Sequence, residues 1–405
     1  MAKYNYKRDV FKGLTPFPFL GEVKTRVKNI EAAKAEIPES VFNPNRLSAK
    51  LHPHYQCVKV IEVKELNGAK SYVIGPDAEK GTASLAYFRA GQYISIALDI
   101  NGITANKPYT ISSNPADALG DSDTTYTLTV KHQDGGQGSE YILNNWQVGT
   151  ELLTSGPLGT FYYTDLRDAK NVIAVAGGSG ITPFCSMAGA IVSGIEDFNL
   201  TILYGSRNAE SILLKDELDE LAAKSGGKVK VVYVLSDEAA EGYEHGFITA
   251  ELIKKYAEGD YSIFACGPKA MYNFLDGEVK KLGLPSRRVR YELSGEFGDP
   301  AQDAAYPQDA HDKEFRIKVW IRGEVQEVPC RASQSLLRAM EAAGIRVPSD
   351  CRSGKCGWCH SRLISGDVFV PEKADGRRTA DKKFGWIHPC STYALSDVEL
   401  EVFPL

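Results

Sequence analysis

Four cysteines near the carboxyl end of the chain are the residues best suited to chemistry. They follow the spacing Cys-x4-Cys-x2-Cys, with a fourth cysteine after thirty further residues, at Cys351, Cys356, Cys359 and Cys390. Thiolates at this spacing hold a 2Fe-2S cluster in one class of iron–sulfur proteins. Gly354 and Gly357 lie within the spacing and would let the backbone curl tightly, with its amides facing the sulfurs. We therefore predict a 2Fe-2S cluster on these cysteines.

Zinc is the alternative metal for this group. Structural zinc sites usually come from two Cys-x2-Cys pairs, and the group contains one such pair. His360 and His388 stand beside the cysteines, but four thiolates already complete a cluster, so we expect surface or supporting roles for both histidines. The remaining cysteines are scattered, which does not suit a secreted disulfide scaffold. A reducing cytoplasm is the expected compartment.

A glycine-rich segment follows the apolar run NVIAVA and precedes a predicted helix. Backbone amides at a helix start can bind a pyrophosphate, and glycines let the phosphates approach closely. The segment lacks the Gly-x-Gly-x-x-Gly pattern of the usual dinucleotide fingerprint. Later apolar runs end near Arg207 and at Cys266-Gly267-Pro268, and ligands of parallel sheets bind at such strand ends. We predict a nucleotide cofactor here, with a phosphate loop formed by Gly177, Gly178, Ser179, Gly180, Ile181, Thr182 and Pro183.

A third group lies earlier in the chain, after a predicted strand, and consists of Lys107, Pro108, Tyr109 and Thr110. This string resembles the Arg-x-Tyr-Ser/Thr motif of the ferredoxin-NADP reductase superfamily. The resemblance implies that the tyrosine ring stacks on a flavin, the small hydroxyl bonds the flavin N5 atom, and the cation neutralises the flavin phosphate. Gly138 and Ser139 precede a predicted helix, whose first amides suit the same phosphate. Taken singly, an ordinary strand end and an ordinary turn are the alternatives.

Together these motifs resemble those of the ferredoxin-NADP reductase superfamily. The string from Lys107 to Thr110 is similar to its Arg-x-Tyr-Ser/Thr motif, residues 156–161 to its Gly-Pro-x-Gly-x-Phe turn, and residues 177–183 to its Gly-Gly-x-Gly-Ile-x-Pro loop. The segment CRSGKCGWC resembles plant-type ferredoxins, and this resemblance extends from Phe315 to Val402. The domain order resembles that of the single-chain reductases of oxygenase systems.

The resemblance implies a set of cofactors and a division of roles. It implies FAD, with FMN open, NADH, with NADPH open, and the 2Fe-2S cluster. Tyr109 and Thr110 would hold the flavin ring, while Cys266 and Glu292 would line the nicotinamide pocket and the flavin edge. Lys107 departs from the family's arginine, and a lysine is a point charge that cannot form a forked contact with phosphate.

The elements that must position these residues divide the 405-residue chain into five segments. Residues 1–54 are an extension of unknown role, with a charged helix expected from Glu22 to Ala35. Short alternating runs predict an antiparallel β-barrel for the flavin over 55–165. Apolar strands alternating with helices predict an α/β domain with a parallel sheet for the nicotinamide over 166–298. Residues 299–313 suit a linker. Residues 314–405 suit an α+β ferredoxin domain of the β-grasp type that the resemblance implies, with a helix around Ser335–Ala343.

The predicted function is that of an NAD(P)H:acceptor oxidoreductase. Electrons would pass from NAD(P)H through the flavin and the cluster, one at a time, to a redox partner protein. Two alternatives stay open: an electron-input docking subunit of a larger respiratory or reductive complex, and a redox sensor. Arg352 and Lys355 are expected on a basic docking face for the partner.

Two other classes of partner are disfavoured. The net charge of −5 argues against nucleic acid. The uncharged run from Asn171 to Ile195 is long enough to span a bilayer, but its glycines and Pro183 predict a strand, a turn and a helix instead. Neither pattern predicts an oligomeric state.

Overall fold

The computed structural model describes residues 19–32, 43–120, 122–133, 136–292 and 295–403. The chain divides into two units, residues 1–50 and residues 51–405. In the first unit, helix α1 spans Phe19–Ala32, and helix α2 (Asn43–Leu51) begins there. The expected charged helix is thus present and begins at Phe19, while residues 33–35 of that prediction lie outside the described residues. Over the described ranges, no helix is both long and apolar enough to cross a membrane.

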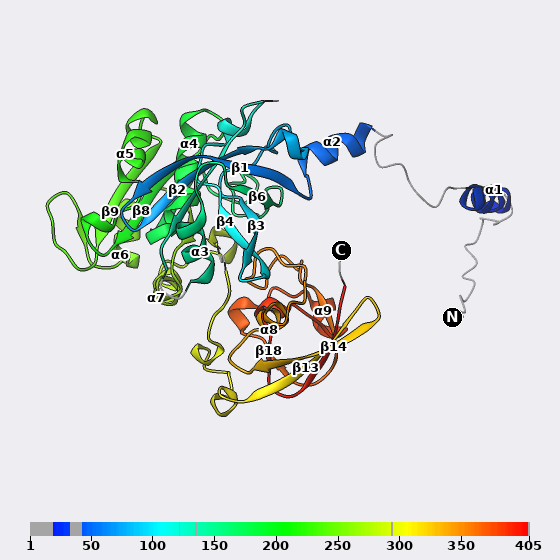
Figure 1. The fold of residues 1–405 in the computed structure, drawn as a ribbon. Helices are drawn as coiled ribbons and strands as arrows, with labels where there is room; N and C mark the ends of the chain where they lie inside the picture. Colours follow the sequence, from blue (N-terminus) through cyan, green and yellow to red (C-terminus); the bar gives the residue numbers. More distant parts are fainter. Residues whose placement is uncertain (1–18, 33–42, 121, 134–135, 293–294, 404–405) are drawn as a thin grey trace, which may run out of the picture. The chain divides into compact units, whose positions relative to one another are not determined.

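The first part of the larger unit is a curled antiparallel sheet (Figure 1) with the strand order β4-β3-β6-β1-β2-β5. Its strands are β1 (Gln56–Leu66), β2 (Ala69–Pro76), β3 (Tyr93–Ile100), β4 (Ile103–Thr110), β5 (Tyr126–Lys131) and β6 (Glu151–Thr154). A bridge between Ile111, which directly follows β4, and Leu128 of β5 connects the two outer strands. Ile142 of helix α3 (Gln137–Asn145) packs into the apolar interior with Tyr72 and Ile94. The predicted antiparallel barrel is therefore confirmed, in the form of a curled sheet.

The second part is a parallel sheet with the order β10-β9-β8-β7-β11-β12. Its strands are β7 (Asn171–Gly177), β8 (Asn199–Ser206), β9 (Val229–Leu235), β10 (Glu244–His245), β11 (Tyr261–Cys266) and β12 (Val289–Tyr291). Its helices are α4 (Thr182–Val192), α5 (Lys215–Lys224), α6 (Ala250–Tyr256) and α7 (Lys269–Lys280). Alternate residues of β7 face opposite sides: Val172 packs with Phe184 of α4, and Ile173 packs with Leu275 of α7. The uncharged run is therefore a buried strand followed by a buried helix, as predicted.

The third part is a mixed sheet with the order β14-β13-β19-β15-β17, drawn from yellow to red in Figure 1. Its strands are β13 (Glu314–Ile321), β14 (Glu324–Arg331), β15 (Ser361–Ser365), β17 (Trp386–Ile387) and β19 (Val398–Val402), and β16 (Val368–Phe369) pairs separately with β18 (Tyr393–Ala394). Helix α8 (Leu336–Ala342) begins at the expected place because the Ser335 hydroxyl accepts the Arg338 amide, a standard N-cap. Helix α9 (Thr379–Lys383) precedes β17. This confirms the predicted α+β domain, called the ferredoxin domain below.

The segment predicted as a linker packs against the ferredoxin domain. Tyr306 and Ala310 are buried in a small apolar cluster with Ala332, and the Tyr306 ring lies 5.1 Å from the Phe369 ring. The aspartates and prolines of the segment suggested an extended linker, but a single aromatic residue is enough to fix the segment to its neighbour.

Candidate cofactor sites

The four cysteines of the predicted cluster come together between the loop before β15 and the turn after β17. The Sγ atoms of Cys359 and Cys390 lie 3.4 Å apart. The amides of Ser353 and Cys356 donate to Sγ of Cys351 at 3.4 and 3.3 Å. The Cys356 thiol and these amides hold the pKa of Cys351 well below its usual value. The amides thus favour a thiolate at Cys351, the form that binds metal, whereas pairing with neighbouring thiols raises the pKa of Cys356 and of Cys390.

The tight curl predicted for this loop is present at Gly354. Its φ is +79°, and an ideal Cβ atom there would lie 2.0 Å from the carbonyl oxygen of Ala374. Because no side chain fits this space and L-residues rarely adopt this conformation, the position requires glycine.

The spacing of the sulfurs distinguishes the two candidate metals. Tetrahedral zinc with Zn–S bonds of about 2.3 Å requires four sulfurs about 3.8 Å from one another. Within the part of the chain that the structure describes, no three of the four thiol sulfurs lie within 4.8 Å of one another. A two-iron cluster instead needs two pairs of thiolates, one pair for each iron. The donors therefore fit a 2Fe-2S cluster and do not fit a single zinc ion.

Arg352 is buried, which makes the prediction that it contributes to an exposed docking face wrong. Its side chain is 1% exposed, because carboxylates of Glu341 and Glu296 enclose it. Lys355 is exposed, as expected. Burial raises the pKa of Glu292, and the charge of Lys355 partly opposes this rise, so Lys355 lies near the predicted flavin edge. The supporting role expected for His388 agrees with the geometry, since its Nδ1 atom lies 2.6 Å from the Gly354 carbonyl oxygen.

The residues predicted to hold the flavin come together at the end of β4 and the start of α3. An ideal Cβ atom on Gly138 would lie 3.3 Å from the Tyr109 hydroxyl and 3.4 Å from Cγ of Lys107. Ser139 donates its hydroxyl to the Gly136 carbonyl, and the N-cap residue of α3, Gly136, has no side chain that could cap the α3 amides. These amides suit a phosphate beside the Lys107 side chain. Gly135, which begins the glycine-rich segment that contains Gly138, lies outside the described residues.

Tyr93 of β3 is a neighbour of this site that sequence reasoning missed. It is the cross-strand partner of Thr110, so the two side chains share one face of the sheet. Burial raises its pKa, and the nearby thiols of Cys351 and Cys356 raise it further. Tyr93 therefore lies between the predicted flavin site and the cluster loop. Only the strand register, which sequence patterns do not fix, could have revealed it.

The glycine-rich loop and two further strand ends form the predicted nucleotide site. Gly177 ends β7, a tight turn follows, and Pro183 stands in the first turn of α4. The Tyr204 hydroxyl donates to the Gly178 carbonyl at 3.0 Å. An ideal Cβ atom on Gly180 would lie 2.1 Å from the carbonyl oxygen of Cys266, so the loop touches the end of β11. Exposed Arg207 follows the end of β8, as the prediction requires.

Cys266, predicted to line the nicotinamide pocket, and Glu292, predicted at the flavin edge, are connected through Tyr272. The Tyr272 hydroxyl accepts the Gly267 amide at 2.9 Å and donates to the Glu292 carbonyl. Burial, and then the charge of Glu292, raise the pKa of Cys266, so it stays a neutral thiol. Burial also raises the pKa of Glu292 to about 7. Tyr272 lies inside a helix, and no local pattern distinguishes it from a packing residue.

Three domain families match the chain in the predicted order. They are the Oxidoreductase FAD-binding domain over residues 78–163, the Oxidoreductase NAD-binding domain over 174–276, and the 2Fe-2S iron-sulfur cluster binding domain over 319–395. The heme-dependent oxidative N-demethylase beta subunit of Ectopseudomonas mendocina is 30% identical over 76% of this chain and 87% of its own length. The chain belongs to this family of flavin and iron–sulfur reductases.

Other members of the reductase family align along nearly their whole length. The glycine betaine monooxygenase reductase subunit of Chromohalobacter salexigens is 25% identical over 90% of this chain and 99% of its own length. The structure of phthalate dioxygenase reductase superposes with a TM-score of 0.62 and 24% identity, over 86% of this chain and 98% of that chain.

This reductase is therefore an NAD(P)H-dependent oxidoreductase with FAD and a 2Fe-2S cluster as its cofactors. When bound, the flavin exchanges a hydride with the nicotinamide, and the cluster carries electrons one at a time. The protein's part is to hold these groups at fixed separations and to tune their surroundings.

Proposed function

We propose that this reductase supplies single electrons to an oxygenase protein. Two of its relatives are reductase components of named monooxygenases, and they align with this chain over most of their length. One structural relationship supports the internal order of transfer. Tyr93 lies near the thiols of Cys351 and Cys356 in the cluster loop. Its cross-strand partner is Thr110, which belongs to the proposed flavin site.

We assign roles to the predicted residues as part of the same proposal. Lys107 and the start of α3 bind the flavin phosphate, and the strand end that follows Lys107 binds the flavin ring. The residues of this flavin site are Lys107, Pro108, Tyr109, Thr110, Gly138 and Ser139. The dinucleotide is bound by the loop after β7 and by two further strand ends, which comprise Gly177, Gly178, Ser179, Gly180, Ile181, Thr182, Pro183, Arg207, Gly267 and Pro268. Cys351, Cys356, Cys359 and Cys390 bind the cluster. The domain boundaries are those expected from the sequence, 55–165, 166–298 and 314–405.

The chain's own groups prepare the site in three ways. The Tyr109 ring fixes the orientation of the flavin by stacking, and the Thr110 hydroxyl offers a hydrogen bond to N5. Cys266 offers an uncharged, polarisable surface to the nicotinamide, because its thiol keeps its proton. Glu292 titrates near neutral pH and can hold a proton at its carboxylate next to this pocket.

The test uses the purified chain loaded with FAD and the cluster. NADH-driven reduction of ferricyanide reports the flavin, and reduction of cytochrome c reports the cluster. We expect Cys390→Ser to abolish cytochrome c reduction while ferricyanide reduction continues. A chain that neither holds nor binds flavin, or that reduces neither acceptor, would overturn the proposal.

The oxygenase partner requires a second experiment. The tagged chain is captured from its native host, and the captured protein is tested for reduction by NADH through the chain. We expect an oxygenase that is reduced only when the cluster is intact. Capture of respiratory subunits that accept the electrons instead would favour the role of a docking subunit in a larger complex.

A further inference from the structure

Arg352 lies between the cluster ligands Cys351 and Cys356 in the sequence, but its side chain points away from solvent. Its guanidinium makes a forked ion pair with Glu341, with N–O distances of 2.7 and 2.7 Å. Its Nε atom also donates to Oε1 of Glu296 at 2.6 Å, and one terminal nitrogen donates to the Asn106 carbonyl at 3.2 Å. All three acceptors surround a single arginine side chain, so its donors are almost fully used.

These acceptors belong to different parts of the chain. Glu341 lies in helix α8 of the ferredoxin domain, Asn106 lies in strand β4 of the flavin domain, and Glu296 lies in the segment that follows the parallel sheet. Only the pair with Glu341 is internal to the ferredoxin domain. The other two contacts join that domain to its neighbours, and their loss would not remove the internal pair.

Further contacts join the same parts. The Asn106 side chain donates to the Ser349 carbonyl at 2.8 Å. The Gly295 amide donates to the Cys351 carbonyl at 3.3 Å, and the Tyr393 hydroxyl donates to the Gly298 carbonyl at 2.7 Å. The backbone on both sides of the first cluster ligand is thus attached to the flavin domain and to the segment after β12.

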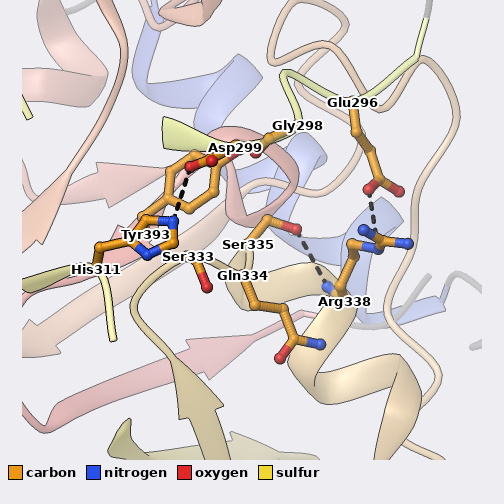
Figure 2. Close-up of a pocket in the computed structure, with 9 residues that line it drawn as sticks. All are labelled: Glu296, Gly298, Asp299, His311, Ser333, Gln334, Ser335, Arg338 and Tyr393. Atoms are coloured by element: carbon orange, nitrogen blue, oxygen red, sulfur yellow. Dashed lines mark hydrogen bonds and ion pairs between the residues drawn. The ribbon is translucent and has the colours of Figure 1, made fainter. Parts of the chain in front are cut away.

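Glu296 is shared among several cations. Figure 2 shows it directed at Arg338 at one end of a cleft, where the two groups lie 3.1 Å apart. Its carboxylate also lies 3.4 Å from the ammonium of Lys107. Burial opposes its ionisation, but Arg352, Lys107 and Arg338 together hold its pKa below the usual value. Glu296 therefore stays charged and links the cluster loop to strand β4 at neutral pH.

Arg352 also adopts an unusual backbone conformation. Its φ is +54°, in the left-handed region, which is energetically unfavourable for a non-glycine residue. Arginine occupies the position despite this cost because its side chain reaches three acceptors that no glycine could reach. The strain is offset by the buried ion pairs, and it fixes the direction in which the loop leaves Cys351.

We propose that Arg352 is a positioning residue for electron transfer, which anchors the cluster loop to the flavin domain through Glu296 and Asn106 and so sets the separation between the flavin and the cluster. This inference rests on the proposed function, because it concerns the step between the two centres. Electron transfer slows steeply as its centres move apart, so an anchor beside a cluster ligand governs that step. The groups proposed to bind the dinucleotide lie at the loop after β7 and at two further strand ends, so we expect transfer from NADH to the flavin not to depend on the anchor.

The test compares two variants with the parent, each loaded with FAD and the cluster. Arg352→Lys keeps the charge but removes the fork, and Glu296→Gln leaves the internal pair of Arg352 with Glu341 intact. After rapid mixing with NADH, flavin bleaching and cluster reduction are followed separately. We expect cluster reduction to slow several-fold in both variants, because electron transfer falls off steeply as the two centres separate, while flavin bleaching in Arg352→Lys stays at the parent rate.

A second measurement does not depend on turnover. Hydrogen exchange of the amides in β4 and in residues 295–299 should be faster in both variants, because these segments lose their attachment to the cluster loop. Iron and sulfide contents and the electron paramagnetic resonance spectrum of the chemically reduced cluster should match the parent. Arg316→Lys is the control, since Arg316 is an exposed arginine in the same domain, 3.7 Å from Glu327.

The outcomes separate this inference from the proposed function. Variants that bind both cofactors and reduce the cluster at the parent rate would overturn the positioning role and leave the reductase assignment intact. Slower cluster reduction accompanied by an altered cluster spectrum would also overturn it, because Arg352 would then act on the cluster itself. A parent chain without flavin or cluster would instead defeat the proposed function.

Discussion

The ammonium of Lys107 lies 3.4 Å from Oε1 of Glu296, while its Cγ atom lies beside Gly138 at the start of helix α3. The 3.4 Å contact is long for a charge-assisted hydrogen bond and leaves donors of the ammonium available. The surrounding side chains, Lys107, Arg338, Arg352, Glu296 and Glu341, sum to one excess positive charge. That excess suits a flavin phosphate at the α3 amides.

Lys107 is therefore expected to contribute to flavin affinity although the family has arginine there. Lys107→Ala should weaken FAD binding by about 1.5–3 kcal/mol, the contribution of a hydrogen bond to a charged group. Lys107→Arg should retain the affinity. Fluorescence titration of the flavin-free chain with FAD measures both, with exposed Lys64→Ala as the control. If Lys107→Ala binds FAD as tightly as the parent, Lys107 pairs only with Glu296 and does not contribute to flavin binding.

The assignment of the cluster ligands can be tested by metal and sulfide analysis and by substitution of one ligand. Iron and acid-labile sulfide should each be present at about two per chain. Cys390→Ser should lose the cluster, because each iron needs its pair of thiolates, while NADH should still bleach the flavin. Cys330→Ser is the matched control, since Cys330 is buried in the same domain but stands outside the group. Stoichiometric zinc without sulfide in the parent chain would contradict the assignment.

Sequence reasoning succeeded where the chemistry is local in the chain. The first three cysteines, the glycines after β7 and the serine that caps α8 each lie within a few residues of the groups they serve. The anchor around Arg352 has no such pattern, because its partners Glu296 and Asn106 are 56 and 246 residues away. For that reason the sequence predicts an exposed Arg352, since a charged loop residue usually lies at the surface.

Tyr93 and Tyr272 illustrate a second limit. Each is an aromatic residue in a regular element, where packing is the ordinary role. Tyr93 gains its position from the register of β3 with β4, and Tyr272 from the approach of α7 to the segment after β12. Register and helix approach follow from tertiary packing, so short sequence windows do not determine them.

Gly180 provides a test of the nucleotide loop. An added Cβ atom would lie 2.1 Å from the carbonyl oxygen of Cys266, so Gly180→Ala must push the loop away from the end of β11. We expect a loss of about 1–3 kcal/mol in stability, typical of overpacking, and weaker NADH binding. Thermal unfolding and NADH titration of the flavin-loaded chain measure the two effects.

Gly277→Ala is the matched control for this substitution. Gly277 lies inside helix α7 with no atom within 4 Å of the added methyl group. Gly277→Ala should raise the free energy of unfolding by about 0.5–1 kcal/mol, because alanine is the better helix former. The affinity for NADH should not change. Equal NADH affinity in the two variants would show that the loop after β7 does not bind the dinucleotide.

Glu292 makes a prediction for the pH dependence of stability. Burial raises its pKa from 4.5 to about 7, so between these values the folded chain binds more protons than the unfolded chain. Stability must then fall as the pH rises through this window, by at most about 3 kcal/mol for one group. Glu292→Gln removes the titration, so its thermal midpoint should exceed that of the parent by a margin that grows from about pH 5.5 to about pH 8. Exposed Glu324→Gln should follow the parent curve throughout. Parallel curves for Glu292→Gln and the parent would mean that Glu292 ionises at its ordinary value, and the proton at its carboxylate would then be absent at neutral pH.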